Sequence, residues 1–161
     1  KLEAVQGDKP VSLATLTAIN GGWNWNVGTP TDPFGNTYSS ASNFVICNES
    51  AKGDLEVVGD SNPGVYAAPR IFESYSEYRV YGEYSKLSFD VVANIKIPED
   101  YYGSVKVYAD DILVYTSQDI GRKTDLISNN VDITGAEYIK IVVDTYENGD
   151  VLMLLNCTLS K

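Results

Sequence analysis

Hydrophobic and polar residues alternate along several stretches of the chain, and this period of two is typical of β-strands buried on one face. In the clearest stretch, Lys86–Ile95, every second residue is apolar: Leu87, Phe89, Val91, Ala93 and Ile95. Ser104–Ala109, Tyr138–Val143 and Val151–Leu159 show the same alternation. These stretches predict strands that share one hydrophobic core.

Further apolar runs predict shorter strands between clusters of turn residues. They are Leu13–Ile19, Asn43–Cys47, Leu55–Val58, Tyr66–Phe72, Glu77–Tyr81, Ile112–Thr116 and Leu126–Ile133. Asp110-Asp111 separates two strand-like runs and predicts a tight hairpin, because Asp tolerates left-handed dihedral angles. No segment shows helical periodicity beyond a turn. We therefore predict an all-β fold, an antiparallel β-sandwich.

The last predicted strand is apolar on both faces over its first half. Val151, Met153, Leu155, Cys157 and Leu159 are expected to share one face. Leu152 and Leu154 make the opposite face apolar as well. Such a strand is central, covered or part of an interface.

Length and charge narrow the class of protein. The 161 residues, 43% of them apolar, fit one folded domain, which we place at residues 11–161 after a linker or cloning remnant at residues 1–10. The net charge of −10 repels phosphate backbones and anionic lipids, so we expect neither nucleic acid nor membrane as a partner. No apolar run approaches the roughly 18 residues that a membrane span needs.

The chain has no histidine and two cysteines. A Ser-His-Asp triad and a His-ligated zinc site are therefore excluded within it. Cys47 and Cys157 form either one disulfide or two buried thiols, and we favour buried thiols. The twenty-two acidic residues offer no defined pair for a glycosidase, so we expect no enzyme activity.

Trp23 and Trp25 alternate with Asn24 and Asn26 in a stretch that follows the first predicted strand. In an extended segment both rings fall on one side. Exposed rings can stack on the C–H face of a sugar, and amides can bond its hydroxyls. Trp23, Asn24 and Trp25 are therefore candidate ligand-binding residues. The alternative is that at least one indole closes an open end of the sandwich.

Other loops add candidates for the same site. Tyr101 and Tyr102 follow a turn, Tyr66 lies beyond Asn62-Pro63-Gly64, and Arg70 offers a planar donor fork that suits a sugar diol. We expect at least two of these groups to meet on one rim and bind a neutral sugar. Asp144, Asn148 and Asp150 carry hard oxygen ligands, which could hold a structural calcium ion although no EF-hand spacing is present. No other cofactor is expected.

A set of short motifs in a shared order resembles the NPCBM family of carbohydrate-binding modules of bacterial secreted proteins. The motifs are the opening strand Val11–Leu16, the segment Asp32–Tyr38, the strand and turn Tyr78–Leu87, the hairpin Gly103–Ser117 and the segment Val131–Ile141. The resemblance covers about residues 11–160. At Gly64–Pro69 the chain lacks the histidine that better-studied members carry.

The resemblance implies a jelly-roll type β-sandwich and non-catalytic carbohydrate binding. It also implies an extracellular or cell-surface location in a bacterium, with the domain attached to other domains of a larger secreted protein. The alternative is a protein-interaction or structural domain of a bacterial surface or scaffold protein.

Overall fold

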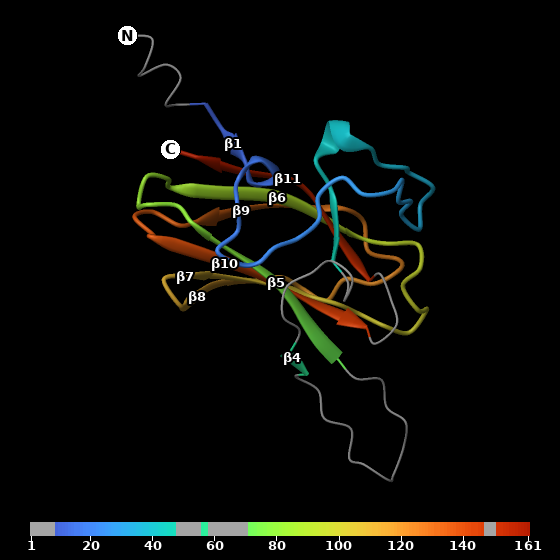
Figure 1. The fold of residues 1–161 in the computed structure, drawn as a ribbon. Helices are drawn as coiled ribbons and strands as arrows, with labels where there is room; N and C mark the ends of the chain where they lie inside the picture. The colour runs from blue at the N-terminus through green and yellow to red at the C-terminus, as the bar shows by residue number, and fades with distance from the viewer. Residues whose placement is uncertain (1–8, 48–55, 58–70, 147–150) are drawn as a thin grey trace.

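Two antiparallel sheets pack face to face in the computed structural model, which describes residues 9–47, 56–57, 71–146 and 151–161 (Figure 1). The predicted antiparallel β-sandwich is confirmed. One sheet has the order β1-β11-β6-β9, with β3 beside β11: Val11–Ser12, Leu152–Ser160, Lys86–Ala93, Ile127–Asp132 and Val45–Cys47. The other has the order β2-β5-β10-β7-β8, with β4 beside β5: Asn20–Gly21, Ile71–Arg79, Tyr138–Tyr146, Val105–Ala109, Ile112–Thr116 and Glu56–Val57.

The core lies between the sheets and follows the alternation of the sequence. Leu87, Phe89 and Val91 of β6 face it from one sheet, and Ile139 and Ile141 of β10 face it from the other, all at most 1% exposed. The predicted strand Lys86–Ile95 is two residues shorter in the structure, because β6 ends at Ala93. Ile95 lies beyond the strand and is 41% exposed. None of the helical segments among the described residues is long and apolar enough to cross a membrane.

Strand β5 is longer than the sequence pattern indicates. The predicted break between Phe72 and Glu77 is wrong, because β5 pairs with β10 without interruption from Ile71 to Arg79. Ser74 and Ser76 occupy inward positions in this stretch and are fully buried. Polar residues at buried positions remove the period-two signal although the strand continues.

The predicted strand Leu13–Ile19 is also wrong. Leu13–Thr15 form a 3-10 turn (η1), in which the Ser12 hydroxyl accepts a hydrogen bond from the Ala14 N–H. Leu13 is fully buried and anchors the turn against the core. Because serine side chains compete with the strand ladder for backbone groups, the pairing of β1 ends at Ser12. A second 3-10 turn, η2, spans Ser40–Ser42.

A β-bulge in β11 changes which side chains face the core. Asn156 adopts a left-handed conformation (φ 53°), and the register with β6 shifts between Leu155 and Thr158. Leu154 before the bulge and Cys157 after it therefore both join the core between the sheets. The predicted shared face of Met153, Leu155, Cys157 and Leu159 is wrong, since Met153 and Leu155 belong to a separate cluster.

This second cluster lies on the outer face of the sheet that contains β11. Met153 and Leu155 pack there with Phe44 and Val92, and all four are at most 1% exposed. Tyr38 and Ile46 pack against them. The apolar outer face of β11 is thus covered by Tyr38, Phe44 and Ile46 of the same chain. Because Met153 and Leu155 are buried there, this face does not support the interface that the sequence left open.

Both cysteines are free, buried thiols, as we favoured from the sequence. Cys47 lies at the end of β3 opposite Leu152 of β11, and Cys157 follows the bulge in β11. Burial raises the pKa of both thiols.

Strands β8 and β9 are the outermost strands of the two sheets and meet at one edge of the sandwich. The Tyr115 hydroxyl of β8 donates a hydrogen bond to Oδ1 of Asn129 in β9, and the Tyr115 ring packs edge-on against Phe89. The hairpin before β8 confirms the expected turn, since Asp110 and Asp111 both have positive φ (49° and 67°). Beyond this bridge, side chains of β8 are exposed to solvent.

Candidate functional site

The tryptophan segment begins where β2 leaves the edge of β5. Gly21 takes a positive φ of 74°, and a Cβ there would lie 2.2 Å from the Tyr75 carbonyl oxygen, so only glycine fits. At its far end, Asn26 N–H donates to the Phe44 carbonyl (2.7 Å), and Asn26 Oδ1 accepts from Phe44 N–H (3.0 Å). The segment is thus tied at both ends.

Trp23 is a core residue. Its side chain is 5% exposed, and its Nε1–H donates a 2.9 Å hydrogen bond to Oγ of Ser74 in β5. A buried indole with its N–H satisfied is the stable arrangement for tryptophan. The expectation of an exposed ring is therefore wrong for Trp23, and the alternative, an indole that fills the sandwich, applies to it.

Trp25 and Asn24 reach the surface. The Trp25 ring is half-buried and meets Trp23 edge-to-face, with ring centroids 6.2 Å apart. Burial raises the pKa of Tyr78 in the adjoining core. Asn24 is exposed. Of the two predicted rings, only Trp25 therefore has surface that a ligand could contact. The exposed side-chain amide of Asn24 lies next to it in the sequence.

Tyr101 and Tyr102 lie in the loop between β6 and β7. Tyr101 packs against the core, whereas Tyr102 is 59% exposed. The Tyr102 ring rests on Gly121, where an added Cβ would lie 2.5 Å from its Cε1 atom. As expected, this loop therefore presents one exposed ring, that of Tyr102. Tyr102 contacts Gly121, whereas Trp25 contacts Trp23.

The remaining predicted site residues are outside the described part of the chain. Tyr66, Arg70, Asn148 and Asp150 fall in its gaps, and Asp144 belongs to β10 without a described side chain. Within the described residues, no three Cys, Asp or Glu side chains gather as metal ligands would.

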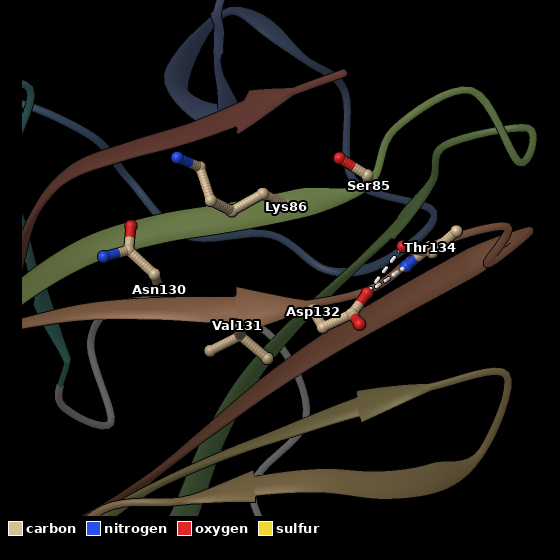
Figure 2. A pocket seen from close by; sticks show the side chains of 6 residues that line it. All are labelled: Ser85, Lys86, Asn130, Val131, Asp132 and Thr134. Carbon is tan, nitrogen blue, oxygen red and sulfur yellow. Dashed lines mark hydrogen bonds between the residues drawn. The ribbon is translucent and has the colours of Figure 1, made fainter.

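A polar hollow of about 370 Å³ lies at the ends of β6 and β9. Figure 2 shows its lining residues: Ser85, Lys86, Asn130, Val131, Asp132 and Thr134. Lys86 lies directly opposite Asp132 in the β6–β9 ladder. The sequence pattern does not reveal this hollow, because its residues come from segments more than forty positions apart. The only signal was the polar outward face of the predicted strand Leu126–Ile133.

Hydrogen bonds orient the polar groups of this hollow. Oδ1 of Asp132 accepts from the N–H (2.9 Å) and the hydroxyl (2.6 Å) of Thr134, as Figure 2 shows. These bonds lower the pKa of Asp132, so its carboxylate is ionised at neutral pH. Asn130 Oδ1 accepts from the Ser88 hydroxyl (2.8 Å), which leaves its amide nitrogen as a donor. The hollow can hydrogen-bond a polyhydroxylated ligand, but it contains no aromatic ring for stacking.

The domain is thus an antiparallel β-sandwich with surface rings and a hollow lined mainly by polar residues. A family model described as "NPCBM/NEW2 domain" matches residues 49–154, more than half of the chain. The chain belongs to the NPCBM/NEW2 domain family, as its motifs indicated. No curated protein sequence matches it significantly.

Solved structures with the same fold include CBM51 modules of Clostridium perfringens. The CBM51 of its GH95, in complex with methyl-galactose, is 14% identical with a TM-score of 0.57, over 94% of this chain and 100% of that one. A second structure is a chain of ZmpB from the same organism, which contains CBM51-2 in complex with GlcNAc together with INT domains. It is 18% identical with a TM-score of 0.58, over 96% of this chain. This chain spans only 32% of that ZmpB chain. At such identities the likeness shows the fold.

Proposed function

We propose that this domain is a non-catalytic carbohydrate-binding module that binds a neutral sugar weakly through exposed aromatic rings. Its membership of the NPCBM/NEW2 family carries the proposal. The shared fold with modules solved in complex with methyl-galactose and GlcNAc supports it.

The proposed ligand-binding residues are Trp25, Asn24, Tyr101 and Tyr102, together with Tyr66 and Arg70 from the part of the chain that the structure does not describe. Trp25 offers ring surface, and buried Trp23 holds it from the core side. Among the described rings of this set, Tyr102 is the most exposed. Amide and guanidinium groups would bond the sugar hydroxyls while the rings stack on C–H faces.

Weak binding follows from the small number of rings. One stacked ring contributes about 1–3 kcal/mol, by analogy with bases on aromatic platforms. With one or two such rings we expect dissociation constants of about 10 μM to 1 mM. A module of this kind acts by keeping a larger protein near its glycan, so we place the domain in an extracellular or cell-surface protein of a bacterium, joined to other domains.

A glycan array followed by calorimetric titration tests the proposal. Trp25→Ala and Tyr102→Ala should each weaken binding of the best sugar by at least about fivefold, the loss of one stacked ring. Tyr81→Ala is the matched control, because Tyr81 is 60% exposed in the turn after β5, stacked by Arg79, and outside the proposed site. Absence of binding to every glycan, or equal losses in all three variants, would contradict the proposal.

A further inference from the structure

A second hollow adjoins the polar one at the edge of the sandwich. It also measures about 370 Å³ and is lined by Ala109, Asp110, Ile112, Val114, Asp132, Ile133, Thr134, Gly135 and Ala136. Asp132 and Thr134 line both hollows and form the wall between them. Most residues that line the second hollow are apolar, although Asp110, Asp132 and Thr134 add polar atoms to its wall. Two of its apolar side chains are unusually open to solvent, with Ile112 66% and Val114 41% exposed. Exposed apolar side chains gathered beside a hollow favour a ligand at this edge.

The polar side offers one acceptor between donors. Both hydrogen bonds that Thr134 donates to Asp132 end on Oδ1. No described residue donates a hydrogen bond to Oδ2, which is therefore available as an acceptor. The Lys86 ammonium and the Asn130 amide nitrogen are donors on the same side, and Lys86 makes no ion pair within the described part of the chain. An acceptor flanked by donors matches two neighbouring hydroxyls, since each hydroxyl both donates and accepts.

The backbone of β8 argues against strand addition at this edge. Val107 pairs with Tyr115 and Tyr108 pairs with Leu113, so Val114 is an extra residue that interrupts the ladder. Such a bulge bends an edge strand and blocks regular pairing with another chain. The exposed Ile112 and Val114 therefore suit a compact apolar group better than an extended peptide.

We infer that the β8–β9 edge is a second saccharide site, which takes a sugar with an N-acetyl group beside a pair of hydroxyls. The hydroxyls bond Asp132 Oδ2, Lys86 and Asn130, and the acetamido methyl packs in the second hollow against the exposed side chains of Ile112 and Val114. The site is separate from Trp25 and Tyr102, and it stands whether or not those rings bind sugar.

Amide-resolved NMR titration of the whole chain with N-acetylglucosamine and with glucose tests the inference. We expect shifts at residues 112–114 and 130–136, with N-acetylglucosamine binding about fourfold more tightly, the effect of burying one methyl group. Trp25→Ala should leave these shifts unchanged. Their absence with both sugars, or equal affinities for the two, would overturn the inference, and loss of shifts near Trp25 alone would count only against the proposed function.

Two substitutions separate binding from folding. Asp132→Asn keeps an oxygen for Thr134 but replaces the free Oδ2 with a donor, and it should weaken N-acetylglucosamine about tenfold with an unchanged melting temperature. Ile112→Ala should remove the preference over glucose while glucose affinity stays constant. Unchanged sugar binding in both variants would overturn the site, as would a concentration-dependent dimer that covers residues 112–114.

Discussion

The Tyr38 hydroxyl donates a 2.7 Å hydrogen bond to Oδ2 of Asp32, a carboxylate that is only 1% exposed. The Asn36 side chain also donates to Oδ2 (3.0 Å), and the N–H groups of Phe34 and Asn36 donate to Oδ1 (2.9 and 3.0 Å). A buried charge is tolerated only when it is bonded in this way. The segment Asp32–Tyr38, which carries part of the family resemblance, is therefore a structural loop around one carboxylate.

Removing the Tyr38 hydroxyl should destabilise the domain. Tyr38→Phe deprives a buried charge of one donor, and we expect a loss of about 2 kcal/mol in the free energy of unfolding. Urea denaturation measures it. Tyr81→Phe removes an exposed hydroxyl and should change stability by less than about 0.5 kcal/mol. Equal effects of the two variants would show that the Asp32 bond contributes nothing.

Stability should fall in acid because of the same carboxylate. Burial raises the pKa of Asp32, but the hydrogen bonds from Tyr38, Asn36 and Phe34 outweigh it, so the folded pKa lies below the ordinary value. The unfolded chain then binds the proton first, and the stabilisation, complete above the unfolded pKa of about 3.9, is lost as pH falls through the folded pKa. Urea midpoints between pH 7 and 3 measure this decline. Asp32→Asn should flatten it, and an unaltered profile would contradict the assignment.

Trp23 and Trp25 should differ in what their loss does. Trp23→Ala empties a core position and should cost about 3–5 kcal/mol, seen as a lower melting temperature. Trp25→Ala removes a half-buried ring and should cost clearly less, leaving a folded domain for the sugar titration. Ser74→Ala, which removes only the partner of the Trp23 indole N–H, should lie between wild type and Trp23→Ala. Similar melting temperatures for both Trp→Ala variants would refute a core role for Trp23.

Thiol titration should find both cysteines reduced. In denaturant without reductant, we expect two reactive thiols per chain, because Cys47 and Cys157 are free. In the native state both should react slowly, since burial limits access and raises the pKa of each thiol. A count of zero in denaturant would establish a disulfide instead.

Local patterns predicted most strands because each needs only its own alternation of inward and outward side chains. Lys86–Ala93 and Val105–Ala109 were foreseen for this reason. The sequence pattern predicted two separate strands where the structure has the single strand β5, because Ser74 is polar although it faces the core. Its burial depends on the Trp23 indole, 51 residues away, which satisfies the hydroxyl. Sequence alternation cannot register a partner so distant.

The candidate site divides in a similar way. Residue type indicated Trp25 and Tyr102 as possible sugar contacts, but it indicated Trp23 equally. Only the position of Trp23 between the two sheets shows that this ring is buried. The polar hollow escaped detection, because Lys86 and Asp132 become neighbours only through the β6–β9 register.

By itself the sequence determined the class of this protein: its two-residue period specifies strands, its motif order specifies the family, and its missing histidine removes several kinds of catalysis. The tertiary structure alone decided which apolar faces are covered and which polar groups converge. The left-handed Asn156 shows why, since one bulged residue exchanges the inward and outward faces of β11. Facing depends on register and bulges, and these are set by contacts between strands far apart in the chain.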